Sequence, residues 1–76
     1  MSKHKDVSGG DCIRVLCNEY GFEVVRQRGS HVVLKLIVAN TPIVTVVPLH
    51  RSLKRGTLKN VLDLARVDMD DFLREF

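Results

Sequence analysis

The chain has 76 residues, of which 45% are hydrophobic and 28% charged, and it carries a net charge of +3 with two cysteines. A chain of this length buries only a modest core, so we expect one domain over residues 1–76, and a multidomain enzyme is excluded. The first ten residues lack the apolar core of a signal peptide and no apolar run reaches the length of a membrane span, which predicts a cytoplasmic protein that does not engage a membrane.

The positive charge is concentrated in the middle of the chain. No Asp or Glu occurs from Val24 through Leu62, and the acidic residues lie towards the two ends. The basic residues of this stretch are Arg26, Arg28, Lys35, Arg51, Lys54, Arg55 and Lys59. Clustered Lys and Arg neutralise phosphates and release counterions, so the stretch favours a nucleic acid as partner. A solvated face without any partner explains the charges equally well.

The two cysteines do not indicate a disulfide or a metal site. Cys12 and Cys17 are too close together on one predicted helix to join distant parts of the fold, so both are expected to be reduced thiols. No CxxC or HxxxH spacing occurs, and therefore neither a metal nor another cofactor is predicted.

The first predicted element is an amphipathic helix over residues 8–20. Its apolar residues recur at helical spacing and are Ile13, Leu16, Cys17 and Tyr20. Ser8 or the following glycines open the helix, and Gly21 ends it. Met1 to Val7 is predicted to be a loose tail.

A β-hairpin follows over residues 22–27 and 31–38, which are rich in β-branched residues. Its turn lies at Arg28, Gly29 and Ser30, and the glycine is expected to adopt a positive φ. Alternation in the second strand gives one apolar face, which should contact the helices: Val32, Leu34, Leu36 and Val38. The residues of the opposite, outward face are His31, Val33, Lys35 and Ile37.

The second half of the chain contains one more strand and two helices. Residues 39–42 are predicted to form a turn, and residues 43–47 a short strand that ends at Pro48. Thr57 is predicted to cap a helix whose apolar residues are Leu58, Val61, Leu62 and Ala65. Asp68 is predicted to cap a last short helix with an apolar face of Met69, Phe72, Leu73 and Phe76. This α-β-β-β-α order predicts an α+β fold in which helices cover one face of a three-stranded antiparallel sheet.

His31 is the candidate catalytic residue. Cleavage of RNA by its own 2′-hydroxyl needs a base to take that proton and an acid to protonate the departing 5′-oxygen, and histidine can do either near neutral pH. Its outward position between Arg28 and Lys35 would place cations near a reacting phosphodiester. The residue type and position also fit an ordinary half-exposed strand residue.

The loop and helix start at residues 50–59 are candidate phosphate contacts. His50 is expected to support binding rather than to catalyse. Lys54 and Arg55 precede the predicted helix, where loop cations, backbone N–H groups and the helix dipole favour an anion, and Arg51 and Lys59 flank them. The chain has no tryptophan and its phenylalanines lie at element ends, so no platform for stacking single-stranded bases is expected.

Four segments carry a resemblance to a known family. They are "GF" at 21–22, "RQRGSH" at 26–31, "VVPLHRSLKRGTL" at 46–58 and "VDMDDFLREF" at 67–76. In order and spacing they resemble the HicA toxin family, which are small RNA-cleaving partners of HicB antitoxins. The resemblance runs from about Ser8 to Phe76.

This resemblance implies a fold like that of a double-stranded-RNA-binding domain, a ribonuclease activity on mRNA and a catalytic histidine that matches His31. Gly29 and Ser30 would then hold the histidine in a fixed orientation and let the RNA backbone come close, and the start of the second long helix would contact phosphate. Many members place a second histidine or another polar residue directly after the motif histidine. This chain has Val32 there, which puts assistance from that neighbour in question.

The leading hypothesis is therefore the toxin of a type II toxin–antitoxin system, an endoribonuclease (mRNA interferase) that is neutralised by a HicB-like antitoxin. The alternatives are a non-catalytic RNA-binding module, or an inactive homologue that acts through protein interaction. An acidic antitoxin is expected to cover the outward face of the second strand and to bury Val33 and Ile37. Alternatively, the C-terminal helix or a neighbouring strand covers these two residues within the monomer.

Overall fold

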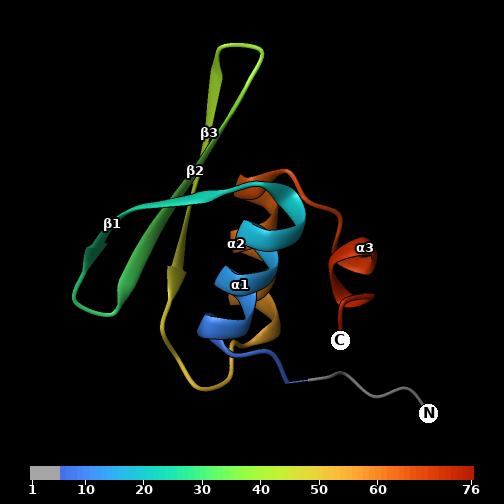
Figure 1. Ribbon diagram of the computed structural model, residues 1–76. Coiled ribbons are helices and arrows are strands. Elements are labelled where there is room, and N and C mark those ends of the chain that lie inside the picture. Colours follow the sequence, from blue (N-terminus) through green and yellow to red (C-terminus); the bar gives the residue numbers. More distant parts are fainter. Residues whose placement is uncertain (1–5) are drawn as a thin grey trace.

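The computed structural model describes residues 6–76 and has six elements. They are α1 (Gly9–Tyr20), β1 (Glu23–Arg28), β2 (His31–Val38), β3 (Thr41–Pro48), α2 (Arg55–Ala65) and α3 (Met69–Leu73). The strands form one antiparallel sheet in the order β1-β2-β3, and α1 and α2 lie on the same face of it (Figure 1). The predicted α+β architecture is confirmed. None of the helices in the described part of the chain is long and apolar enough to cross a membrane.

The ends of α1 and α3 follow local capping chemistry. The side chain of Ser8 accepts a hydrogen bond from the Asp11 N–H at 3.0 Å, and Gly21 ends α1 in the left-handed conformation with φ 83°. The side chain of Asp68 accepts from the Asp71 N–H at 3.0 Å and so opens α3. These predicted helix boundaries are confirmed.

The start of α2 differs from the prediction. The helix begins at Arg55, so Thr57 lies within the first turn and does not cap it. Lys54 occupies the N-cap position, its side chain makes no capping bond, and its carbonyl accepts from the Leu58 N–H at 2.9 Å. Leu53, directly before the N-cap, is buried in the core.

The turn between β2 and β3 is shorter than predicted. It consists of Ala39 and Asn40 alone, both with positive φ (51° and 67°), which is the geometry that closes a two-residue hairpin. Thr41 and Pro42 therefore belong to β3 and not to the turn. Beyond Leu36 and Ile43, which still contact the core, residues 37–42 form a two-stranded arm that does not pair with β1 and projects beyond the helices (Figure 1).

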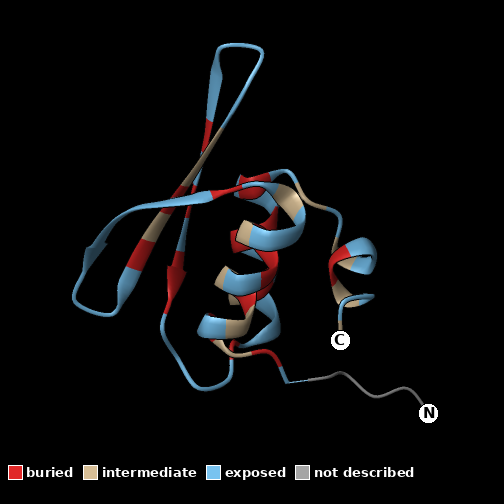
Figure 2. Cartoon of the chain, viewed as in Figure 1, coloured by how far each residue is buried: buried red, intermediate tan, exposed pale blue. Residues whose placement is uncertain are grey.

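The alternation predicted for β2 is confirmed in its first half. Val32 and Leu34 are buried beneath the helices, whereas Leu36 is half-buried and Val38 is 50% exposed. Figure 2 shows the change along the strand, from buried residues over the helices to exposed residues towards the tip of the arm. The sequence pattern continues to the tip, but the helices do not reach it.

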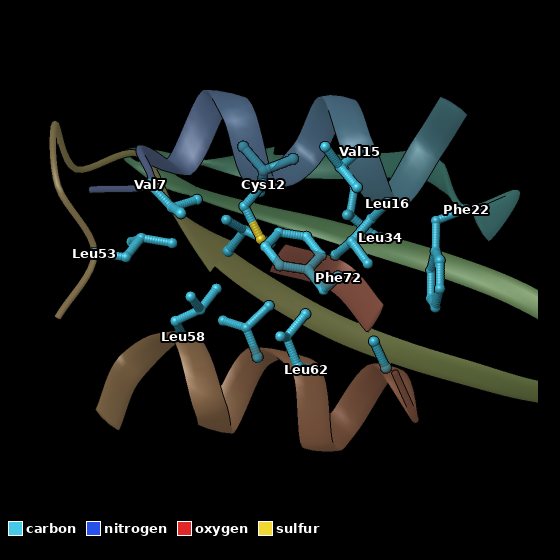
Figure 3. Close-up of a cluster of buried hydrophobic side chains, with 14 of the residues drawn as sticks. Val7, Cys12, Val15, Leu16, Phe22, Leu34, Leu53, Leu58, Leu62 and Phe72 are labelled. Carbon is cyan, nitrogen blue, oxygen red and sulfur yellow. The ribbon is translucent and has the colours of Figure 1, made fainter. Parts of the chain in front are cut away.

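The core lies between α1, α2 and the sheet, and the ring of Phe72 from α3 sits within it (Figure 3). Thr45 is buried among these apolar side chains, and its hydroxyl donates to the Val61 carbonyl at 2.8 Å. Val7 also belongs to the core, with 1% of its surface exposed, so its assignment to a loose tail is wrong. Its carbonyl accepts from the Leu53 N–H at 2.7 Å. Residues 1–5 of the predicted tail lie outside the described residues.

The C-terminal helix is also joined to α1 by a polar contact. The hydroxyl of Tyr20, a residue predicted to be in the core, is half-buried and donates to Asp71 Oδ2 at 2.6 Å. Burial and this hydrogen bond raise the pKa of Tyr20 to about 12, so the hydroxyl keeps its proton throughout the neutral range.

We expect Phe72→Ala to lower the free energy of unfolding by about 3–5 kcal/mol, because it removes a fully buried ring and leaves a cavity. Phe76→Ala is the matched control, since this partly buried ring lies 5.4 Å from Phe72 at the edge of the core and should have a much smaller effect. Urea denaturation measures both values. Equal and small losses would show that α3 does not pack as described.

Candidate functional site

His31 is the first residue of β2 and is exposed on the outward face of the sheet. The next residue, Val32, is buried, and the period-two geometry of a strand therefore directs the imidazole away from the core. Directly opposite His31 lie Arg28 in β1 and Pro48 in β3. The predicted orientation of His31 and its proximity to Arg28 are both found.

The turn before His31 is a tight glycine turn. Gly29 has φ 57°, which confirms the predicted positive φ, and its carbonyl accepts from Gln27 Nε2 at 2.9 Å. Ser30 is exposed, and its carbonyl accepts from the Leu49 N–H at 2.7 Å. The residue before the histidine is thus tied to the loop that follows β3.

That loop, residues 49–53, is held at both ends by backbone hydrogen bonds. Besides the bond from Leu49 to Ser30, the His50 carbonyl accepts from the Gly9 N–H at 2.9 Å, and the Leu53 N–H donates to Val7. The β1–β2 turn, the N-terminus of α1 and the start of α2 are thereby gathered at one end of the molecule. The amino-acid sequence does not predict this arrangement, because none of the bonds involves a side chain.

The predicted phosphate contacts lie on this loop and at the start of α2. His50, Arg51, Lys54 and Arg55 are all exposed, and the first turn of α2 has no acidic residue. Lys59 lies one turn further and pairs with Asp63 at 3.1 Å, an exposed pair that contributes little to stability. The structure thus brings the loop cations together with a helix N-terminus, and it places Lys59 next to an acidic group.

Lys35 does not lie close to His31. It is four residues further along β2, which corresponds to about 13 Å at the usual strand rise, and its cross-strand partner in β1 is Glu23. The expectation that Arg28 and Lys35 flank one reacting phosphodiester is therefore wrong for Lys35. This lysine lies on the same face of the sheet as His31 but opposite Glu23.

A β-bulge in β1 gives the outward face a cation that sequence analysis did not assign to the site. The register shifts between Val24 and Arg26, so that Arg26 lies opposite Val33 and Arg28 opposite His31. Without the shift, Arg26 would lie opposite the buried Val32 and point towards the core. Two arginines at i and i+2 in a strand were the available signal for a shared face.

The same outward face is also apolar towards the arm. Val33 is half-buried, whereas Ile37, Val44 and Val46 are exposed by 60%, 44% and 38%. Antiparallel register places Val46 opposite Val33 and Val44 opposite Lys35, so these side chains share one surface. Figure 1 shows α3 on the helical side of the sheet, so the C-terminal helix does not cover Ile37.

The cysteines are unsuited to nucleophilic chemistry. Burial raises the pKa of Cys12 to about 12, and burial together with the negative charge of Glu23 raises the pKa of Cys17. Both are free thiols and stay protonated near pH 7, whereas the thiolate is the reactive form. Within residues 6–76 no group of three His, Cys, Asp or Glu side chains could hold a metal ion.

The protein is thus a small α+β domain in which the open face of the sheet carries a histidine beside two arginines. A family model for the HicA toxin of bacterial toxin–antitoxin systems matches residues 9–67. The chain therefore belongs to the HicA toxin family, and the match spans all elements except α3. Searches of curated proteins and of solved structures gave no match.

Proposed function

We propose that this HicA-family toxin is an endoribonuclease, an mRNA interferase, that acts in the cytoplasm, cleaves mRNA with His31 and is neutralised by a HicB-like antitoxin. The observation that carries the proposal is the placement of His31: exposed, directly after a fixed glycine turn and directly opposite Arg28. A protein that only binds RNA has no need for a titratable group at this position.

In the proposed reaction, RNA lies across the outward face with one phosphodiester at His31. The imidazole removes the proton of the 2′-hydroxyl, whose oxygen attacks phosphorus, and the protonated ring then gives that proton to the departing 5′-oxygen. Arg28 and Arg26, which lies two residues earlier on the same face of β1, stabilise the negative charge that develops on the phosphoryl oxygens. The neighbouring Val32 points into the core and takes no part. The proposed mechanism therefore gives both proton transfers to His31, and the alternative is that His31 performs one of them.

The neighbouring phosphates bind further along the molecule. Arg51, Lys54 and Arg55 with the N-terminal turn of α2 contact the backbone, as does Lys59, while Lys35 contacts a phosphate on the other side of His31. These residues contact phosphates and not base edges, and they position the RNA without reading its sequence.

The antitoxin covers the outward face of the sheet. This surface combines cations at the His31 end with exposed Ile37, Val44 and Val46 towards the arm, which suits an acidic protein with an apolar contact region. A partner bound there hides His31 from RNA. The exposure of Ile37 supports this hypothesis over coverage within the monomer for that residue, whereas Val33 is already half-buried between β1 and β3.

A non-catalytic RNA-binding module, or an inactive homologue that acts through protein interaction, would use the same basic surface. Both alternatives predict that RNA stays intact. Cleavage of a transcribed mRNA by the purified wild-type protein separates them from the proposed ribonuclease.

His31→Ala should abolish RNA cleavage and growth arrest while the melting temperature stays within about 2 °C of wild type, because an exposed side chain leaves no core cavity. Cleavage of a transcribed mRNA by the purified protein measures the activity. His50→Ala is the matched control and should retain cleavage with weaker binding. Full cleavage by a folded His31→Ala variant refutes the assignment, and RNA binding without cleavage by the wild type identifies a binding module.

Replacing Lys54 and Arg55 with Gln should weaken RNA binding about equally for all sequences and reduce the salt slope by roughly one unit for each phosphate that is no longer neutralised. Titrations at several salt concentrations measure the slope. Arg14 and Arg74 offer a control with the same change in charge, because both are exposed and pair with acidic neighbours elsewhere. Equal effects of the two double variants would mean that only net charge matters.

Hydrogen exchange with and without the antitoxin should show new protection in residues 28–37 and in β3 when the partner binds. The reason is that the outward face becomes inaccessible to solvent and its strands open less often. Protection confined to α1 and α2 would place inhibition on the opposite side of the molecule.

A further inference from the structure

Gly9 lies at a buried position in a helix, where the backbone does not require the conformational freedom of glycine. It is the first residue of α1, and only Gly21 and Gly29 have positive φ among the glycines of residues 6–76. Glycine is a poor helix residue compared with alanine, so a glycine here requires a packing reason.

The packing reason is a close approach of two backbones. A Cβ placed on Gly9 would overlap with the carbonyl oxygen of Pro48 and lie 2.9 Å from the Cα of Leu49. Neither atom belongs to a flexible side chain, so the loop after β3 would have to move. The next residue gives the opposite result, because a Cβ on Gly10 would have only the Ser8 hydroxyl nearby, at 3.8 Å.

The backbone that Gly9 contacts is the one that fixes the residue before the histidine. The Leu49 N–H donates to the Ser30 carbonyl at 2.7 Å, and on the other side of Leu49 the His50 carbonyl accepts from the Gly9 N–H at 2.9 Å. The carbonyl of Ser30 belongs to the peptide unit that leads directly into His31. Gly9, Leu49, Ser30 and His31 thus form a continuous chain of backbone contacts.

We propose that Gly9 is a positioning residue for His31: the absence of a side chain lets α1 abut the Pro48–Leu49 backbone, which in turn sets the place of the Ser30–His31 turn. The inference rests on the proposed function, in which His31 is the reacting group. The contact also holds the loop that carries His50 and Arg51, whereas Lys54, Arg55 and Lys59 at α2 and Lys35 in β2 belong to other parts of the fold. The inference therefore predicts a larger effect on turnover than on affinity.

Gly9→Ala and Gly10→Ala form a matched pair, since both add one methyl group to the first turn of α1. Because a displacement near 1 Å at a catalytic group can cost on the order of 100-fold, Gly9→Ala should lower kcat for RNA cleavage by about 10- to 100-fold with KM changed less than about threefold. Gly10→Ala should leave both constants unchanged. In NMR spectra, Gly9→Ala should shift the amide signals of Ser30 and Leu49 and the ring signals of His31.

A second variant tests the inference in case Gly9→Ala does not fold. An amide-to-ester replacement at Leu49 removes only the N–H that bonds to Ser30, and it should lower kcat in the same direction. If Gly9→Ala folds, the inference is overturned when this variant matches Gly10→Ala in kcat and in the His31 signals. If Gly9→Ala does not fold, the inference is overturned when the ester variant keeps the wild-type kcat. Failure of the proposed function is separate: the His31→Ala variant would then cleave RNA, or the wild type would not, while the NMR shifts still report on Gly9.

Discussion

The helices cover only one face of the sheet, and the placement of the candidate residues on the strands depends on this constraint. In a strand, successive side chains alternate between faces, so burial of Val32 and Leu34 beneath the helices forces His31 into solvent. A slip of one residue in β2 would exchange the two sets, exposing valine and leucine and burying the imidazole and a lysine. The free energy of core formation therefore determines on which face of the sheet the histidine lies.

The bulge in β1 shows how a local irregularity adapts this rule. An even alternation from Val24 would direct Arg26 to the face of the sheet opposite to that of His31, although β1 is exposed along its whole length. The extra residue restores both arginines to the open face beside His31. The cations of the site are therefore a result of how β1 and β2 pair.

Much of this arrangement can be predicted from the sequence, because hydrophobic periodicity and capping residues are local signals. They correctly give α1 with Ser8 and Gly21, the hairpin around Gly29 and the outward direction of His31. The errors concern long-range contacts. Nothing in the N-terminal segment predicts that Val7 is buried by its contact with the loop before α2.

The candidate site shows the same division. The sequence places Arg28 and Lys35 on either side of His31, but distance along an extended strand grows by about 3.3 Å per residue, and only the arginine is brought back by pairing. The contact of Gly9 with the loop after β3 also cannot be predicted from the sequence, because two adjacent glycines are compatible with an ordinary helix start. A close approach of two backbones requires only that a residue lacks a side chain, and this requirement does not distinguish Gly9 from Gly10 in the sequence.

The β2–β3 arm has a consequence for how such toxins can diversify. Its tip lies seven residues along β2 from His31, about 23 Å, and it makes no pairing with β1. Changes in the length or the side chains of the arm leave the histidine, its arginines and the loop before α2 in place. Under the proposed function, changes confined to the arm would alter the contact with the antitoxin and leave the residues proposed for cleavage unchanged.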